Sequence, residues 1–189
     1  MAKLIYLMLM SLDGYIADKN GDFDWAQPTD EVHSFANDLE RPVGTHLYGR
    51  NMYEVMAIWD TLQTHGQPHY IGDFASIWRA ADKIVYSTTL KSVSTERTQL
   101  ARGFEADTIQ RMKDTASRDI TIGGPNLAAH AFKAGLIDLC HIFVFPTTVG
   151  DGKSAFPRGL RLELELQSER RFGGGIIYLQ YRSARSQAA

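Results

Sequence analysis

The chain has 189 residues, 44% of them hydrophobic, which is enough to bury a full core and predicts a single domain, with a second small lobe as the alternative. Its 20 basic and 22 acidic side chains nearly cancel, so the overall charge gives no indication of a nucleic-acid partner or of binding to an anionic membrane surface. No apolar run approaches the roughly 20 residues of a membrane-spanning helix, and the single cysteine, Cys140, cannot form an internal disulfide bond, so we expect a cytoplasmic protein with no membrane segment.

The first predicted element is a buried strand at residues 3–10, where apolar side chains are almost continuous. Turn-forming residues follow at 13–14 and 18–22, interrupted by the apolar pair Tyr15 and Ile16. We interpret this segment as a long loop that is partly tucked against the molecule. A long loop with an apolar island often lies over a cleft.

A helix is predicted from Thr29 or Asp30 to about Leu39. Thr and Asp are good N-terminal caps, and apolar residues recur at helical spacing at Val32, Phe35, Ala36 and Leu39. The first turn carries two carboxylates, those of Asp30 and Glu31. Taken by themselves, carboxylates at this position compensate the helix dipole.

Residues 45–48 are predicted to form a strand that ends in Gly49, Arg50 and Asn51 and leads into a short helix at 52–56. An arginine in this position can bind a phosphate through its forked guanidinium, although an exposed loop arginine without a ligand is the alternative. Residues 61–72 are predicted to be a loop. Its His65 and His69 are separated by Gly and Pro, which break the helical face that a metal pair needs, so no metal site is predicted.

The middle of the chain continues the alternation of strands and helices. A helix is predicted at 71–80, a strand at 84–86, a further strand at 97–100 and a helix at 105–116. Three hydroxyl residues, Ser87, Thr88 and Thr89, follow the strand at 84–86. Such hydroxyls either cap a turn or bind an anion.

The most informative stretch is a short strand at 120–122 followed by Gly123, Gly124 and Pro125. Two glycines let the backbone turn without Cβ clashes, and proline suits the first position of a helix. We expect that helix to run to Lys133, with Gly135 just beyond its end. Free amides and the helix dipole would attract phosphate at its N-terminus, but a tight connection without a ligand is equally compatible with two glycines.

The C-terminal part is predicted to consist mainly of β-strands. Cys140 lies in an apolar run that suits a buried structural thiol, and a strand is predicted at 142–145. Residues 146–159 are predicted to be a loop, residues 160–166 a half-buried strand with alternating leucines, and residues 176–181 its hairpin partner after the glycines at 173–175.

This order of elements predicts an α/β sheet that is mainly parallel and ends in an antiparallel hairpin. Ligands of such sheets bind beyond the carboxyl ends of the strands. Three candidate segments fall at those ends: 49–51, 87–89 and 123–124. The common G-x-G-x-x-G and G-x-x-x-x-G-K-[ST] phosphate-binding motifs are absent, so a dinucleotide would have to be held differently.

Five short segments carry a resemblance to a known family. In chain order they are SLDGYIA (11–17), YGRNMY (48–53), VYST (85–88), IGGPNL (122–127) and FP…GDG (145–152). Together they resemble the dihydrofolate reductase fold family, in particular the branch similar to the reductase domain of bacterial riboflavin biosynthesis. The resemblance implies one three-layer α/β domain over residues 1–183, and we expect residues 184–189 to form a frayed tail.

The same resemblance implies an NADPH site. The backbone around Met10 and Ala17 would meet the nicotinamide carboxamide, and Ser87 and Thr88 would lie near the adenosine ribose and its 2′-phosphate. The phosphates would be lined by Gly49, Arg50, Asn51 and Met52. Gly123 and Gly124 would form the family's typically cis turn, with Asn126 and Leu127 facing the pyrophosphate.

For the substrate, the order Trp25, Pro28, Asp30 is similar to the segment of dihydrofolate reductases that carries the acidic residue beside the pterin ring. Asp30 is therefore the candidate catalytic carboxylate, with Glu31 as the alternative one residue away. Gln27 replaces an apolar family position, and no pair of basic residues suits a folate tail. A complete ribose-phosphate site for the riboflavin precursor is not identified either.

The expected function is an NADPH-dependent reductase that transfers hydride to a pterin-like or aminopyrimidine heterocycle. It would resemble 5-amino-6-(5-phosphoribosylamino)uracil reductase and dihydrofolate reductase. The alternative is a non-catalytic NADP(H)-binding sensor or partner protein on the same fold. The expected partner is a small heterocyclic substrate, with neither nucleic acid nor membrane, and a homodimer is the assembly considered.

Overall fold

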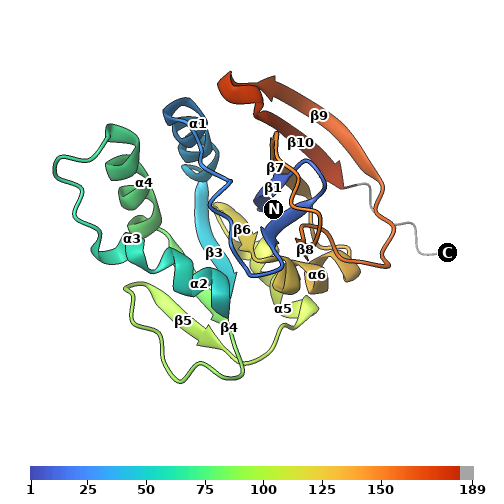
Figure 1. The fold of residues 1–189 in the computed structure, drawn as a ribbon. Coiled ribbons are helices and arrows are strands. Elements are labelled where there is room, and N and C mark those ends of the chain that lie inside the picture. The colour runs from blue at the N-terminus through green and yellow to red at the C-terminus, as the bar shows by residue number, and fades with distance from the viewer. Residues whose placement is uncertain (184–189) are drawn as a thin grey trace.

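The computed structural model describes residues 1–183, in which an eight-stranded sheet lies between two layers of helices (Figure 1). The predicted tail at 184–189 lies outside the described residues. The strands are β1 (Leu4–Ser11), β2 (Tyr15–Asp18), β3 (Val43–Gly49), β4 (Asp82–Tyr86), β5 (Thr98–Ala101), β6 (Asp119–Gly123), β7 (Leu139–Phe145), β8 (Gly152–Ser154), β9 (Leu164–Arg171) and β10 (Ile177–Ser183). The helices are α1 (Asp30–Glu40), α2 (Arg50–Met56), α3 (Ile58–Thr61), α4 (His69–Ala80), α5 (Ala106–Thr115) and α6 (Pro125–Lys133), with a short 3-10 turn at Gly173–Gly175.

The large sheet has the strand order β5-β4-β3-β6-β1-β7-β10-β9. Every pairing from β5 to β7 is parallel, whereas β10 is antiparallel to both β7 and β9. The prediction of a mainly parallel α/β sheet with a C-terminal antiparallel hairpin is therefore confirmed. None of the described helices is both long and apolar enough to span a membrane.

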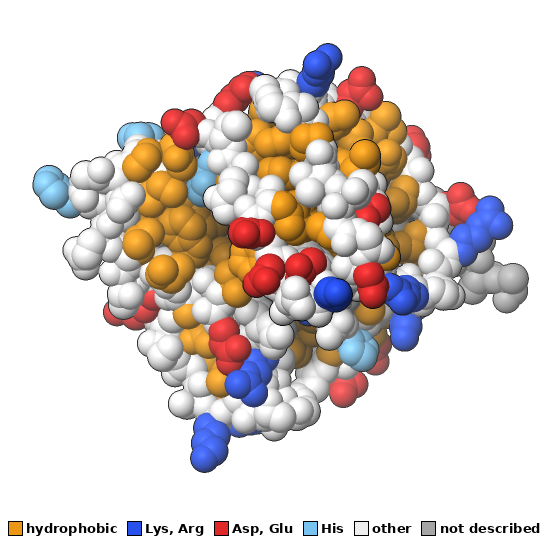
Figure 2. Space-filling view, in the orientation of Figure 1, with side chains coloured by type: hydrophobic (Ala, Val, Ile, Leu, Met, Phe, Trp, Pro, Cys, Tyr) orange, Lys and Arg blue, Asp and Glu red, His pale blue; other side chains and the backbone are white. Residues whose placement is uncertain are grey.

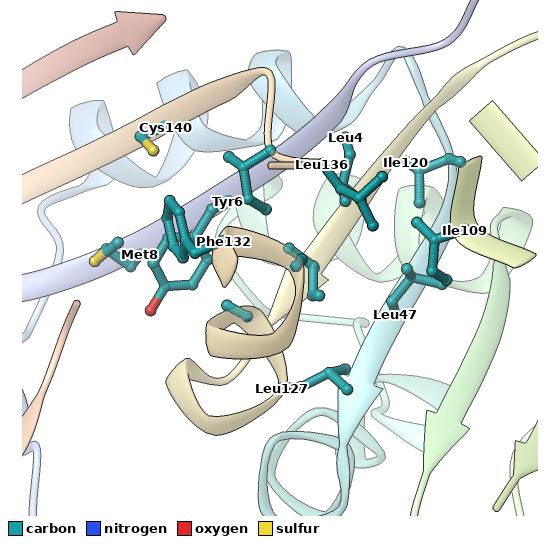
Figure 3. Close-up of a cluster of buried hydrophobic side chains, with 14 of the residues drawn as sticks. Leu4, Tyr6, Met8, Leu47, Ile109, Ile120, Leu127, Phe132, Leu136 and Cys140 are labelled. Atoms are coloured by element: carbon teal, nitrogen blue, oxygen red, sulfur yellow. The ribbon is translucent and has the colours of Figure 1, made fainter. Parts of the chain in front are cut away.

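Side chains alternate across β1 and divide the core between the two faces of the sheet. Leu4, Tyr6 and Met8 pack toward α5 and α6, while Leu7 and Leu9 pack toward α1. Figure 3 shows the first face, where the Tyr6 and Phe132 rings meet edge to face with centroids 5.3 Å apart. Because both faces of the central strands are covered, ligands of such a sheet are expected to bind beyond the carboxyl ends of its strands.

Two segments predicted as loops contain a short ribbon instead. Tyr15 pairs with Ser154 and Asp18 with Gly152, which joins β2 to β8. At Gly152, with φ 157°, a Cβ would lie 2.1 Å from the Ala17 carbonyl oxygen, so only glycine lets the two strands approach. The ribbon depends on a pairing partner more than 130 residues away in the sequence, which a local reading of turn residues cannot detect.

Several element boundaries also differ from the prediction, among them those of α4 and β9. Helix α4 begins at His69, inside the predicted loop, directly after Pro68, which stands at the N-terminal cap position and accepts a hydrogen bond from the Ile71 amide at 3.0 Å. The strand predicted at 160–166 instead spans 164–171 and is exposed along nearly its whole length. Leu160 and Leu162 pack against the main core before the strand begins, and β9 is an edge strand whose Arg170 contacts α1 through Glu31 and Phe35.

Candidate functional site

Three loops that follow neighbouring parallel strands lie together at the carboxyl edge of the sheet. Gly49 ends β3, Ser87 follows β4 and Gly124 follows β6, and β3 lies between β4 and β6. They border a cleft of about 450 Å³, which we call the polar cleft. Its lining residues are Gly49, Arg50, Asn51, Met52, Tyr86, Ser87, Thr88, Arg102, Gly103, Phe104, Gly124, Asn126, Leu127, His130 and Lys153.

The polar cleft brings together most of the residues predicted to hold a cofactor. These are Gly49, Arg50, Asn51, Met52, Ser87, Thr88, Gly124, Asn126 and Leu127. Gly123 lines a second cavity described below, while Met10 packs against the main core and Ala17 is buried in β2. Met10 and Ala17 therefore line neither opening in this structure, and their contact with a nicotinamide stays a prediction.

The N-terminus of α6 faces the polar cleft without a side-chain cap. Its cap position is Gly124 and its first residue is Pro125, which has no amide hydrogen. The first amide that closes a helical turn is that of Ala128, which donates to the Gly124 carbonyl at 3.0 Å. The amides of Asn126 and Leu127 precede it and have no partner within the helix, so they are available to an anion in the cleft.

The turn between β6 and α6 needs both glycines, for different reasons. A Cβ at Gly123 would lie 2.9 Å from Tyr48 Cδ1 and 3.1 Å from Met52 Cγ. The packing therefore leaves no room for a side chain at Gly123. Gly124 has φ 93°, a conformation that L side chains rarely adopt, but its nearest neighbour is Met52 Cβ at 3.6 Å. The peptide bonds of the described residues are all trans, so the expectation of a cis turn here is wrong; the positive φ of Gly124 turns the chain instead.

Three cationic side chains line the polar cleft. Arg50 is held by Glu54, with Nε 2.7 Å from Oε1, and by the Thr89 hydroxyl at 3.1 Å. Arg102 donates to the carbonyls of Ser87 and Leu90 at 3.1 and 2.6 Å, and Lys153 reaches the cleft from β8. Of these three, Arg50 alone was predicted from the sequence, because Arg102 and Lys153 come from segments that only the fold brings to the cleft.

A second, mostly apolar opening of about 220 Å³ lies between α1 and the sheet, and we call it the apolar cavity. It adjoins the polar cleft, because Gly123 lines the cavity, Gly124 lines the cleft and Met52 lines both. Its lining residues are Leu7, Leu9, Pro28, Val32, His33, Ala36, Asn37, Glu40, Tyr48, Met52, Met56, Trp59, Phe74, Thr121, Ile122, Gly123 and Phe143.

The two predicted acidic residues lie at the start of α1, outside the lining of both openings. Thr29 caps the helix by accepting a hydrogen bond from the Val32 amide at 3.3 Å, and Asp30 and Glu31 are both exposed. Glu31 pairs with Arg170 at 2.9 Å. Asp30 lies near His33, which does line the cavity, and it opposes the lowering of the His33 pKa that burial causes.

The acidic residue that does line the apolar cavity is Glu40, at the other end of α1. It lies four residues after Ala36 and eight after Val32, so helical periodicity places it on the same buried face. This spacing was available in the sequence. Its Oε2 atom is buried without a hydrogen-bond partner among the described residues.

Glu40 and His46 are neighbours in a buried site, with 3.6 Å between Oε2 and Nδ1. Burial raises the pKa of Glu40 to about 7 and lowers the pKa of His46 to about 3. Between these values both groups are neutral, so the contact is not an ion pair. The His46 ring is instead fixed by the Thr121 hydroxyl, 2.7 Å from Nδ1.

We expect the free energy of unfolding to report this buried carboxyl. The pKa of Glu40 rises on folding from 4.5 to about 7, so its contribution is fully present below about pH 4.5 and is lost as the pH rises to about 7. Glu40→Gln removes this titration. Between pH 4.5 and 7 the free energy of unfolding of Glu40→Gln should therefore rise, relative to that of the wild type, by on the order of 3 kcal/mol. His46 acts in the opposite direction, with stability lost as the pH falls from 6.5 toward 3, but it titrates in both proteins.

Denaturant unfolding at pH 4.5, 6 and 8 measures this difference. A difference between the two proteins that stays constant with pH would mean that Glu40 does not titrate in this window.

The fold and the two adjoining openings define a dihydrofolate-reductase-like α/β domain, with the larger opening at the carboxyl ends of parallel strands. The model of the RibD C-terminal domain family matches residues 2–178. The chain therefore belongs to the RibD C-terminal domain family, and the resemblance noted from its motifs is confirmed.

Three similar proteins illustrate the relationship. YyaP of Bacillus subtilis (strain 168), described as uncharacterized, is 24% identical over 183 residues, which is 95% of this chain and 94% of that protein. A solved structure from Shewanella sp. PV-4, named for riboflavin biosynthesis, superposes with a TM-score of 0.75 at 24% identity, covering 98% of this chain and all of the other. Dihydrofolate reductase from Enterococcus faecalis, complexed with NADP(H) and RAB-propyl, superposes with a TM-score of 0.60 at 13% identity over 96% of each chain. These structural similarities concern the fold.

Proposed function

We propose that this protein is an NADPH-dependent oxidoreductase that transfers hydride to a pterin-like or aminopyrimidine heterocycle. The observation that carries the proposal is the contact between the two openings. A cleft with three cations meets an apolar cavity at the Gly123–Gly124 turn, with Met52 common to both. A dinucleotide bound along the cleft could bring its reactive ring to the cavity, where a second ring is held.

The polar cleft fits the phosphates of such a cofactor. The uncapped N-terminus of α6 supplies two amides and the positive end of the helix dipole, and the missing Cβ at Gly124 leaves the backbone accessible. Arg50, Arg102 and Lys153 add positive charge around the same space. In the named structural relative from Enterococcus faecalis, NADP(H) is bound to a protein of the same fold.

Within this proposal each residue has a task. The α6 amides hold the pyrophosphate, and Arg50 with the hydroxyls of Ser87 and Thr88 recognises the 2′-phosphate. Bound NADPH supplies the hydride. The aromatic and aliphatic walls of the apolar cavity orient the acceptor ring and exclude water, and Asp30 is the carboxylate proposed to polarise or protonate it from the cavity's outer end.

The direct test is NADPH oxidation in the presence of a panel of pterins, aminopyrimidines and cyclic imines. Turnover with at least one of them is expected. NADPH binding without turnover of any of them would favour a non-catalytic NADP(H)-binding protein, and absence of NADPH binding would contradict both readings.

We expect NADPH to bind more tightly than NADH. Arg50 and the Ser87–Thr88 hydroxyls can contact a 2′-phosphate, which NADH lacks. Arg50→Ala should weaken NADPH binding by about 1–3 kcal/mol, or roughly 5- to 150-fold in Kd, and leave NADH binding nearly unchanged. Isothermal titration calorimetry with both dinucleotides measures the effect.

Arg161→Ala is the matched control, since Arg161 is exposed, pairs with Glu163 and lies outside the polar cleft. Equal affinity of the wild type for the two dinucleotides would contradict the proposed 2′-phosphate contact. A similar loss in Arg161→Ala would show that the effect is a general one of net charge.

A further inference from the structure

The apolar cavity contains one polar side chain whose presence its packing does not explain. Glu40 is inside the protein, its side chain is 11% exposed, and it lines the cavity. Its Oε2 atom has no hydrogen-bond partner among the described residues. Leaving a buried acceptor unpaired destabilises the folded protein, so a residue that keeps one is a candidate for binding a group that the protein itself does not supply.

The neighbouring polar groups are already engaged. Asn37 donates to the Tyr70 carbonyl and to Asp73, both at 2.8 Å, and its Oδ1 atom is 3.1 Å from His33 Nδ1. Thr121 is 2.7 Å from the His46 ring. Glu40 is therefore the acceptor in this part of the cavity that remains for a ligand, and rotation of its carboxyl group can present either oxygen.

The rest of the cavity wall defines what such a ligand can carry. Tyr48, Trp59, Phe74 and Phe143 are aromatic and suit a planar ring. Among the described residues that line the cavity, there is no lysine or arginine. A phosphate held inside would lack a cation and would lie in the same cavity as Glu40.

The surface near the cavity is acidic. The segment between β1 and α1, which ends beside the cavity-lining Pro28, has four aspartates, Asp13, Asp18, Asp22 and Asp24, and one lysine. In Figure 2 acidic side chains gather over the middle of the face where this segment lies. This part of the surface therefore disfavours an anionic substrate.

Building on the proposed function, we propose that Glu40 selects the substrate by accepting hydrogen bonds from the N–H edge of an amino-substituted nitrogen heterocycle, which carries no phosphate on the part inside the cavity. The ring lies among the aromatic side chains, with its donor edge toward Glu40 and its reactive face toward the Gly123–Gly124 turn. In this arrangement Glu40 is a recognition residue at the inner end of the cavity, whereas Asp30 lies at the opposite end of α1.

The experiment compares two probes on the full-length protein saturated with NADPH. One is 2,4-diaminopyrimidine, which has N–H donors, and the other is 2,4-dimethylpyrimidine, which has a similar shape without them. Calorimetry is run on the wild type, on Glu40→Met, and on Glu163→Met as the matched control at an exposed site outside the cavity. Replacing an unpaired buried carboxyl with an apolar chain of similar length should preserve the fold, which melting curves check.

We expect the wild type and Glu163→Met to bind the diamino probe at least tenfold more tightly than the dimethyl probe, and Glu40→Met to bind the two about equally. Equal binding of both probes by the wild type, no binding of the diamino probe, or an unchanged ratio in Glu40→Met would each overturn the proposal. If Glu40→Met does not fold, Glu40→Leu, which also lacks a hydrogen-bond acceptor, replaces it, and a ratio equal to that of the wild type would overturn the proposal.

The proposed function is tested separately by the NADPH titration that precedes each measurement. If NADPH does not bind, that function fails, and the same probe ratio measured without NADPH still decides the role of Glu40. Uridine and uridine 5′-monophosphate test the exclusion of phosphate. Tighter binding of the monophosphate to the NADPH-saturated protein would overturn that part, and equal or weaker binding would support it.

Discussion

Gly124→Val is expected to abolish measurable NADPH binding while the protein stays folded. A branched side chain at φ 93° is strained, at a cost of about 1–3 kcal/mol, which is less than the roughly 5–15 kcal/mol by which domains of this kind are stable. The added Cβ would meet only Met52 at 3.6 Å, an ordinary contact, so the core is not overpacked. The new methyl groups would instead occupy the space in front of the α6 amides, where the pyrophosphate is proposed to bind.

Gly135→Val is the matched control for backbone strain. Gly135 also has a positive φ, 65°, with nothing within 4 Å of a Cβ, and it lies beyond the other end of α6. We expect it to lower the melting temperature by a similar amount and to leave NADPH affinity unchanged. Unchanged NADPH affinity in a folded Gly124→Val variant would mean that the turn has only a structural role.

The features predicted well from the sequence are those that local chemistry determines. Strand β1 has a nearly continuous apolar run, β7 is apolar except for His141, and β6 has β-branched residues at 120–122 followed by the paired glycines that mark its end. The three candidate loops meet because parallel strands place their carboxyl ends on one edge of the sheet. The prediction of a mainly parallel sheet was therefore enough to place most of the polar-cleft residues together.

The features that were not predicted from the sequence depend on contacts between distant segments. Lys153 reaches the polar cleft only because β8 pairs with β2, and Arg102 only because β5 lies beside β4. Neither residue lies in a motif. Glu40 is different, since its position on the buried face of α1 follows from helical spacing. The similarity of the order Trp25, Pro28, Asp30 to dihydrofolate reductases instead placed the predicted catalytic carboxylate at Asp30, with Glu31 as the alternative.

The placement of these carboxylates makes Asp30→Asn the most informative kinetic variant. If Asp30 polarises or protonates the acceptor ring, the substitution should lower kcat by roughly 10²–10⁴-fold, as expected for a lost acid–base group, and leave NADPH affinity unchanged. Glu31→Gln is the control next to it, because the Glu31 carboxylate is engaged by Arg170 at 2.9 Å, and we expect it to change kcat much less. Rates are measured with whichever heterocycle of the panel supports turnover.

Stability measurements separate this role from simple helix capping. Both side chains lie in the first turn of α1, where loss of a carboxylate costs under about 1 kcal/mol through the helix dipole. If Asp30→Asn shows only that small loss and normal rates, Asp30 compensates the dipole and nothing more. A loss of kcat in Glu31→Gln alone would assign the catalytic role to Glu31 instead. A variant at Glu40 should act differently from either, because a recognition residue at the inner end of the cavity affects the binding of the heterocycle, and hence KM, more than it affects the hydride-transfer step.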